Sequence, residues 1–250
     1  MNSSEYDKLD RVEDRMWWFA AVHANLLMAA RRCSFDKSGL PILDAGCGTG
    51  GLLTRLAREF CERPEFGLDL DSQACARAAT KSTQPVCVGS VNDLPFADAA
   101  FAAIFSADVL CHEGVDEDRA LRHFYRSLAP NGWLILNLPA YRWLLSGHDV
   151  AVSNIRRYTA TGVRRLLKAV GFRPVYISYW NTVLLPLMVI TRKLGRRAHD
   201  AASDVRLYPR SIEISCRAVM AVEAALLQHG LRLPFGGSIL AIAAKEGERD

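Results

Sequence analysis

The segment LSGHDVAVSNIRRYT, residues 145–159, gathers side chains that could carry out chemistry. His148 and Asp149 form a candidate proton-transfer pair. Arg156, Arg157 and Tyr158 form a candidate anion-binding cluster. An imidazole beside a carboxylate can accept a proton near neutral pH, and guanidinium groups can grip a carboxylate or phosphate. The alternatives are a hydrogen bond that fixes a loop and a solvated helix entrance. The residues alone leave these interpretations open.

A second histidine lies in the segment SADVLCHEG, which follows a predicted strand. His112 could move a proton or contact the acceptor of a reaction, or it could be a packed residue that opens the next helix. Ligands of open α/β sheets bind at the carboxyl ends of the strands, so the position of His112 is compatible with a functional role.

The segment ILDAGCGTGG, residues 42–51, joins a predicted strand to a predicted helix. Its glycines allow a sharp turn and the close approach of a ligand to backbone N–H groups. This spacing alone is shared by dinucleotide and nucleoside binders. Asp44 would repel a pyrophosphate but could hold an ammonium group, and Asp69, at the end of the next strand, could accept from ribose hydroxyls. A dinucleotide oxidoreductase is therefore the weaker alternative.

The elements that must position these residues alternate between short apolar runs and segments with helical spacing. The predicted strands span residues 40–46, 64–70, 85–90, 101–107, 132–139, 173–180 and 237–246. Strands that alternate with helices indicate a doubly wound, mostly parallel sheet of the Rossmann-like α/β class. The sequence thus predicts seven strands with an N-terminal helical segment and a helical insertion before the last strand.

We expect one domain with four parts. Residues 1–37 form an N-terminal helical cap, 38–180 the cofactor-binding core, 181–236 a helical insertion or lid, and 237–246 the last strand. The insertion begins with WNTVLLPLMVITRKLGRR, which is apolar first and basic afterwards. This order suits a lid or a peripheral membrane contact, and a core-packing helix with a solvated end is the favoured reading.

Composition narrows the class of protein. The net charge is +4, and the basic excess lies in residues 151–250. The seven cysteines are scattered without a C-x-x-C pair, which argues against a disulfide framework and for a reducing cytoplasm. The polar N-terminus is not a signal peptide, and the longest apolar run is too short to cross a bilayer.

Four motifs in order resemble the class I S-adenosylmethionine-dependent methyltransferases, of the type-11 small-molecule group. They are LDAGCGTGG, GLDLD, GSVNDLPFADAAFAAIFSADVLCHE and LAPNGWLILNLPA. The resemblance implies that S-adenosylmethionine is the cofactor and S-adenosylhomocysteine the product. It implies cofactor contacts from the glycine loop and the ends of the next strands, at Asp44, Gly46, Cys47, Gly48, Gly50, Asp69, Leu70, Ser90, Val91, Asn92 and Ala107. The family often has an acid where this chain has Ser90.

The resemblance also bears on a metal. Ubiquinone-pathway O-methyltransferases hold a divalent metal with two acids and a histidine, and the matching positions here are Asp108, Cys111 and His112. A thiol in place of an acid disfavours a hard cation, so we expect no metal.

For the acceptor, the sequence predicts a small molecule, amphiphilic or acidic, of the prenyl, acyl or aromatic acid type. His112, His148 and Asp149 are the candidate catalytic residues, and Trp17, Trp18, Arg156, Arg157 and Tyr158 the candidate acceptor contacts. The basic C-terminal part motivates a nucleic-acid methyltransferase as an alternative, although no N/D-P-P-Y/F motif follows the fourth strand. A non-catalytic protein that binds the cofactor is the third class.

Overall fold

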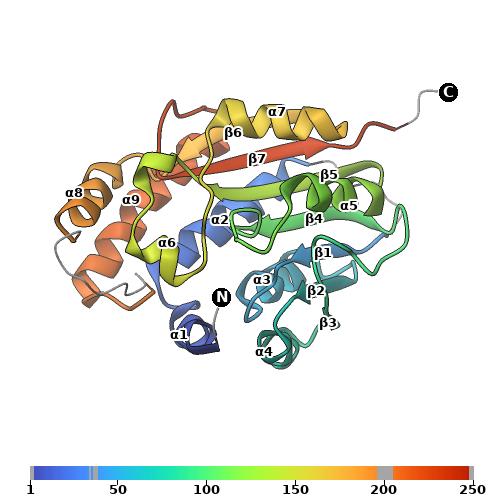
Figure 1. The fold of residues 1–250 in the computed structure, drawn as a ribbon, viewed down its shortest axis with the longest axis horizontal. Helices are drawn as coiled ribbons and strands as arrows, with labels where there is room; N and C mark the ends of the chain where they lie inside the picture. Colours follow the sequence, from blue (N-terminus) through green and yellow to red (C-terminus); the bar gives the residue numbers. More distant parts are fainter. Residues whose placement is uncertain (1–2, 34, 36–38, 196–204, 248–250) are drawn as a thin grey trace.

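The computed structural model describes residues 3–33, 35, 39–195 and 205–247. Its centre is a seven-stranded sheet with the order β3-β2-β1-β4-β5-β7-β6, in which only β7 runs antiparallel to its neighbours (Figure 1). This confirms the predicted fold class. The strands are β1 (Ile42–Ala45), β2 (Glu65–Asp69), β3 (Val86–Val88), β4 (Phe101–Ala107), β5 (Leu128–Pro139), β6 (Arg173–Trp180) and β7 (Ser238–Ala244).

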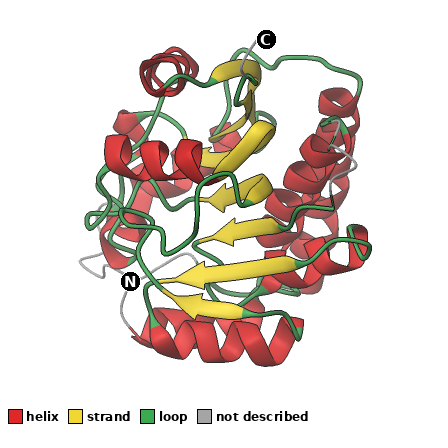
Figure 2. Ribbon diagram, turned by 90° about the vertical axis from the view of Figure 1, so that its right-hand side faces the viewer, coloured by secondary structure: helices red, strands yellow, loops and turns green. Residues whose placement is uncertain are grey.

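Helices cover both faces of the sheet (Figure 2). The helices of the first half are α1 (Ser3–Val12), α2 (Trp17–Arg31), α3 (Gly51–Glu59), α4 (Ser72–Ser82) and α5 (Glu117–Ser127). Those of the second half are the 3-10 turn η1 (Arg142–Leu144), α6 (Gly147–Ala151), α7 (Ala160–Val170), α8 (Leu185–Gly195) and α9 (Arg210–Gln228). The N-terminal helical segment is therefore two helices, and the turn between them lets α1 leave the sheet face on which α2 packs.

Two apolar clusters form the core, one on each face of the sheet. Phe124 of α5 and Leu167 of α7 pack with Ile104 on one face. Leu26 of α2 and Leu56 of α3 pack with Phe105 on the other. Successive residues of β4 point to opposite faces, and both faces are covered, so the strand reads as a continuous apolar run.

Two elements differ from the prediction. β5 begins at Leu128 rather than at residue 132 because Asn131, with φ +63°, forms an irregularity inside the strand instead of a turn before it. The short helix α6 was not expected. Residues 196–204 of the predicted insertion lie outside the described residues. Within the described ranges, no helix is both long and apolar enough to cross a membrane.

The parallel strands end on the side of the molecule where α1, α6 and α8 lie (Figure 1). The glycine loop, the ends of β2 and β4 and the segment after β5 therefore meet at one edge of the sheet.

Candidate cofactor and acceptor site

The glycine loop adopts a backbone that side chains would obstruct. Gly46, Gly48 and Gly50 have φ values of +88°, +52° and +88°. A Cβ on Gly46 would lie 2.2 Å from Cγ2 of Val109, and one on Gly50 would lie 2.7 Å from the Cα of Ala78. The loop thus packs tightly between β4 and α4, and it turns the chain into the N-terminus of α3.

Asp44 stands just before this loop and is almost fully buried. Its Oδ2 has no hydrogen-bond partner among the described residues. Burial, followed by the nearby carboxylates of Glu13 and Asp69, raises the pKa of Asp44 well above its usual value. A buried acid with a free acceptor oxygen and acidic neighbours is a strong attractor for a cation, which matches the ammonium contact expected from the sequence.

Asp69, at the end of β2, connects three segments. Its carboxylate accepts from the backbone N–H of Gly48 at 2.9 Å and of Asp71 at 3.0 Å. The hydroxyl of Tyr6 in α1 donates to the same carboxylate at 3.1 Å. Burial and Asp69 together raise the pKa of Tyr6, so this phenol remains protonated and a donor at neutral pH. Asp69 therefore connects the glycine loop, through Gly48, to α1, through Tyr6.

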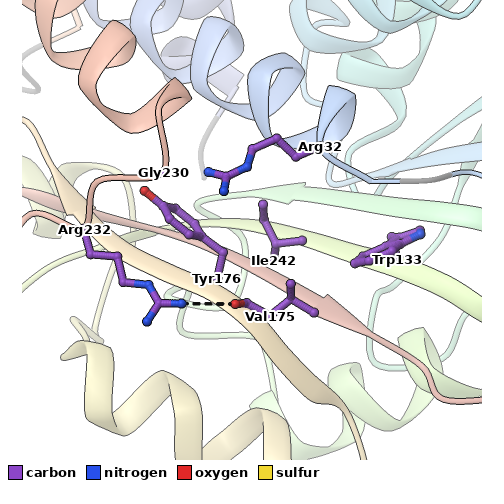
Figure 3. A pocket seen from close by; sticks show the side chains of 7 residues that line it. All are labelled: Arg32, Trp133, Val175, Tyr176, Gly230, Arg232 and Ile242. Carbon is purple, nitrogen blue, oxygen red and sulfur yellow. Dashed lines mark hydrogen bonds between the residues drawn. The ribbon is translucent and has the colours of Figure 1, made fainter.

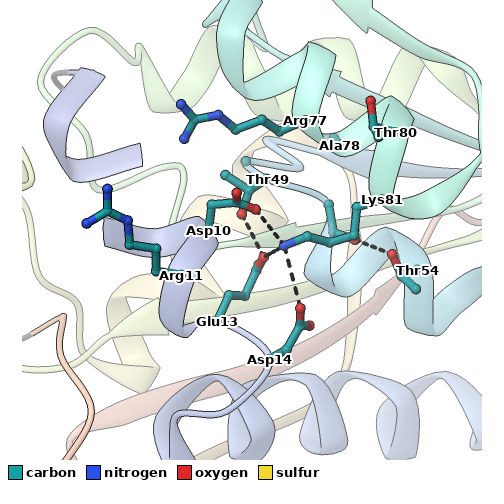
Figure 4. A network of polar contacts seen from close by, with 12 residues as sticks. Asp10, Arg11, Glu13, Asp14, Thr49, Thr54, Arg77, Ala78, Thr80 and Lys81 are labelled. Atoms are coloured by element: carbon teal, nitrogen blue, oxygen red, sulfur yellow. Dashed lines mark hydrogen bonds and ion pairs between the residues drawn. The ribbon is translucent and has the colours of Figure 1, made fainter. Parts of the chain in front are cut away.

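A single ammonium group fastens α1 to α4 (Figure 4). Nζ of Lys81 lies 3.0 Å from Asp10, 3.2 Å from Glu13 and 3.7 Å from Asp14. Glu13 also accepts from the Thr49 hydroxyl at 2.7 Å, and burial raises its pKa. We call these five residues the Lys81 network. It closes α1 over the glycine loop.

The remaining predicted cofactor residues lie at the same edge of the sheet, but they differ in burial and in whether their side chains are hydrogen-bonded. Asn92 donates to the Gly114 carbonyl at 2.9 Å and accepts from the Asp116 N–H at 3.0 Å, so its side chain holds the turn before α5. The Ser90 hydroxyl accepts from the N–H of Asn92. Of the other predicted cofactor residues, Cys47 and Val91 are buried, and Ala107 at the end of β4 is half-buried. The side chain of Leu70 is exposed.

In the 145–159 segment, the side chains of Asp149 and Arg157 are both buried and contact each other. Asp149 is fully buried, and its Oδ2 accepts from the Ser146 N–H at 2.8 Å and the Ser146 hydroxyl at 3.1 Å, which forms a capping box at α6. Its Oδ1 lies 2.8 Å from Nη2 of Arg157, whose side chain is 4% exposed. Arg157 also donates to the Ala140 carbonyl. Asp149 therefore caps α6 and pairs with Arg157, whose guanidinium is not exposed, and the catalytic role of Asp149 stays a prediction.

The two neighbours of Arg157 also serve the backbone. Nη1 of Arg156 donates to the carbonyl of His112 at 2.7 Å, and its Nε lies 3.4 Å from Glu117. The Tyr158 hydroxyl donates to the Leu110 carbonyl at 2.8 Å and is buried. Both residues tie the segment after β5 to the segment after β4. The acceptor contacts predicted for Arg156 and Tyr158 stay predictions.

The two histidines differ in their surroundings. Burial lowers the pKa of His112, so its ring is neutral near pH 7, and its Nδ1 has no partner within the described structure. His148 is half-buried in α6. The catalytic roles of His112 and His148 stay predictions.

Aromatic side chains wall the ends of β5 and β6. Trp18 stacks on Trp180, with ring centroids 5.0 Å apart, and Trp17 meets Trp18 edge-on at 5.7 Å. Tyr141 stacks on Tyr179 at 5.1 Å. The tryptophan pair thus docks α2 onto β6, and aromatic surface extends toward the region where an acceptor would enter.

Sequence reasoning missed Tyr6, Glu13, Lys81 and Tyr141. Each acts through a partner far away in the chain, such as Asp69 for Tyr6, so no local spacing identified it. For Tyr6 and Glu13, the acidic and polar start of the chain was the available signal.

The described residues contain no group of three or more His, Cys, Asp or Glu side chains placed to hold a metal ion. A cavity of about 470 Å³ lies at the opposite edge of the sheet (Figure 3). Arg32 and Arg232 approach the ring of Tyr176 there, at 4.6 and 5.7 Å from its centroid. This cavity contains none of the predicted site residues.

The strand order, the glycine loop and the acids at the ends of β1 and β2 are those of the Rossmann-like class I methyltransferase fold. Residues 43–136 match the family model described as a methyltransferase domain.

Curated proteins with similar sequences include methyltransferases. The chain is 30% identical over 135 residues to a fatty-acid O-methyltransferase of Mycolicibacterium smegmatis, with 53% of this chain and 45% of the relative covered. It is 25% identical over 231 residues to 24-methylenesterol C-methyltransferase 2 of Oryza sativa subsp. japonica, with 80% and 60% covered. The chain therefore spans roughly half the length of these relatives.

Solved structures share the fold. A methyltransferase described as putative, in complex with the Haloferax volcanii Trm112 activator, has a TM-score of 0.61 at 18% identity, covering 98% of this chain and 95% of that one. The [4+2]-cyclase SpnF has a TM-score of 0.63 at 22% identity, covering 94% and 85%.

Proposed function

We propose that this protein transfers the methyl group of S-adenosylmethionine to a small organic acceptor. The observation that carries the proposal is Asp44, a buried carboxylate with an unpartnered oxygen beside a glycine loop that cannot accept side chains. The loop exposes backbone to a ligand, and the acid selects a cationic group over a phosphate. Asp69 adds a second carboxylate at the end of the neighbouring strand.

In this proposal, Asp44 and the Gly46–Gly50 loop hold the methionine end of the cofactor, and Asp69 accepts from the ribose hydroxyls. When bound, the cofactor supplies an activated methyl group on a positively charged sulfur. The protein contributes alignment of the acceptor and exclusion of water. The Lys81 network supports this second task because it holds α1 against the loop.

The acceptor that we propose has an apolar or aromatic body. The half-buried rings of Trp18 and Tyr141, stacked on Trp180 and Tyr179, bring flat apolar groups to the carboxyl edge. The relatives named for fatty-acid and sterol substrates support the same class. An arginine grip on an acidic head group is not part of this proposal because Arg157 is committed to Asp149.

Incubation with S-adenosylmethionine carrying a radiolabelled methyl group tests the proposal. Acceptor pools would contain fatty acids, sterols, prenyl alcohols, phenols and amines, and extraction would separate labelled products. We expect label in at least one pool with the wild-type protein and none with Asp69→Ala. Cofactor binding without transfer to any pool would instead favour the non-catalytic interpretation. Label in added RNA or DNA would favour the nucleic-acid alternative.

We also propose a cytoplasmic location. All seven cysteines are free thiols in the structure, and five of them are buried: Cys33, Cys47, Cys75, Cys111 and Cys216. A reducing compartment suits such an arrangement.

A further inference from the structure

Asp108 is a half-buried residue with one buried carboxyl oxygen, Oδ1, and the proposed chemistry has so far given it no task. It directly follows β4 and adopts φ +55°, a left-handed backbone that costs most residues about 1–2 kcal/mol. The next residue, Val109, packs against Gly46 of the glycine loop. Asp108 therefore stands between the cofactor loop and the aromatic wall of the acceptor side.

One oxygen of Asp108 is fixed and the other is not. Oδ2 accepts from the amide Nδ2 of Asn137 at 3.0 Å, and the backbone N–H of Asp108 donates to the Asn137 carbonyl at 2.9 Å. Oδ1 is buried and has no hydrogen-bond partner in the described part of the chain. An unsatisfied carboxylate oxygen at this depth costs free energy unless a ligand or water donates to it.

Trp180 sets the orientation of Asn137. The indole N–H of Trp180 donates to Oδ1 of Asn137 at 2.8 Å, and an indole can only donate. The amide nitrogen of Asn137 must therefore face Asp108. Trp180 is itself fully buried and stacked on Trp18. This chain of contacts holds the Asp108 carboxyl in one position on the acceptor side.

The charged groups around Asp108 leave its charge only partly compensated. Arg157 attracts it, but the Nε and Nη2 of that guanidinium point to Asp149, whose own charge opposes ionisation of Asp108. The Cys111 thiol donates to the Asp108 backbone carbonyl, and burial raises the thiol pKa. Burial is the largest effect on Asp108, and it raises the pKa of this carboxyl to about 7.

We propose that Oδ1 of Asp108 accepts the proton of the methyl acceptor, and that the acceptor is a neutral molecule with a hydroxyl or amine group. This inference rests on the proposed function. The acceptor atom loses its proton to Oδ1 and bonds to the methyl carbon, while the electron pair of the sulfur–methyl bond stays on sulfur. The proton later passes from Asp108 to water. A carboxylate acceptor fits poorly because it brings no proton and adds negative charge beside Asp108.

The first test needs no turnover. Protein loaded with S-adenosylhomocysteine and labelled with ¹³C at the aspartate carboxyls would be titrated by NMR, with Asp108→Asn used to assign the signal. We expect a midpoint near pH 7, and a shift of this signal on adding 4-propylphenol or 4-propylaniline but not propylbenzene. A signal that titrates in the ordinary range of aspartate, or that none of the hydroxyl and amine probes moves, overturns the inference.

Trp180→Phe is the second variant, and it does not change Asp108 itself. It keeps an aromatic ring against Trp18 but removes the N–H that orients Asn137. We expect the Asp108 midpoint to rise because the Asn137 amide no longer favours the ionised form. An unchanged midpoint contradicts the positioning role of Trp180.

Turnover of matched probes tests the chemistry. Formation of S-adenosylhomocysteine would be measured with 4-propylphenol, 4-propylaniline and 4-propylbenzoate. We expect turnover of the phenol or the aniline, rising with pH through about 7, and about 100-fold slower in Asp108→Asn. Turnover of the benzoate alone, or an unaffected variant, overturns the inference. Calorimetry on the same samples separates the role of Asp108 from the proposed methyl transfer. If the wild-type protein does not bind the cofactor, the proposed function itself is contradicted.

Discussion

Arg157 and Asp149 form a buried ion pair, with Nη2 and Oδ1 2.8 Å apart and side chains 4% and 1% exposed. The pair joins the start of α6 to the segment before α7. Because Arg157 also donates to the Ala140 carbonyl just after β5, the pair fixes the whole 145–159 segment against the carboxyl edge of the sheet.

Breaking this pair should destabilise the fold strongly. Arg157→Met leaves Asp149 buried without its cation, and we expect a loss of about 3–5 kcal/mol in the free energy of unfolding. Arg173→Met is the matched control because its partner Glu246 lies 3.1 Å away with both side chains about half exposed. That variant should lose less than about 1 kcal/mol. Urea denaturation measures both, and equal losses would contradict the structural role of the pair.

Lys81 should control how firmly α1 is closed. Lys81→Met removes the cation shared by Asp10, Glu13 and Asp14, so these acids repel one another near the loop. We expect hydrogen exchange of α1 amides to rise about 10-fold or more while the amides of β4 and β5 stay protected. Arg122→Met, which affects only an exposed pair with Asp118, should leave α1 unchanged. Unaltered exchange in the Lys81 variant would show that other contacts hold α1.

Stability should fall as the pH rises from about 4.5 to 7. Glu65 is buried at the start of β2, and burial raises its pKa to about 7 from 4.5. The folded state therefore binds this proton more tightly than the unfolded state, and the advantage is lost between these two values. Glu65→Gln should flatten the fall, with the variant more stable than wild type at pH 8. The midpoints of urea denaturation, measured across this pH range, test this prediction. If the midpoints of the two proteins change with pH in parallel, Glu65 is not the cause of the fall in stability.

Gly46 should be irreplaceable for both the loop and the cofactor. Gly46→Ala requires a left-handed backbone at φ +88° and places a methyl group into Val109. We expect at least about 1–2 kcal/mol of destabilisation and weakened binding of S-adenosylhomocysteine. Gly114→Ala is the control because no atom lies within 4 Å of its added Cβ. Normal binding by the Gly46 variant would mean that the loop relaxes.

The fold was largely predictable because its signals are local. Apolar runs of strand length, glycines after the first strand and acids before them follow from the residues themselves, and strand β4 matches its expected bounds of 101–107. The break between α1 and α2 and the start of β5 were missed because tertiary packing, not local periodicity, decides them.

The candidate site was predicted unevenly for the same reason. Asp44 and Asp69 lie next to recognisable turns, so their positions at the carboxyl edge followed from the sequence. The pairing of Asp149 with Arg157 depends on how the segment folds back on itself, so the spacing of adjacent polar residues did not reveal it. Asp108 gave no local sign of its unpartnered oxygen, which only the packing of Asn137 and Trp180 reveals.

Calorimetric titration with S-adenosylhomocysteine tests the central claim most directly. We predict binding by wild-type protein with a Kd in the range of about 1 μM to 1 mM, and binding at least 10-fold weaker in Asp69→Asn and in Asp44→Asn. Asp98→Asn, an exposed carboxylate of an ion pair with Arg126, should bind as wild type does. Absence of binding at millimolar concentration, or equal affinity in the Asp44 and Asp69 variants, would contradict the assignment of the cofactor site.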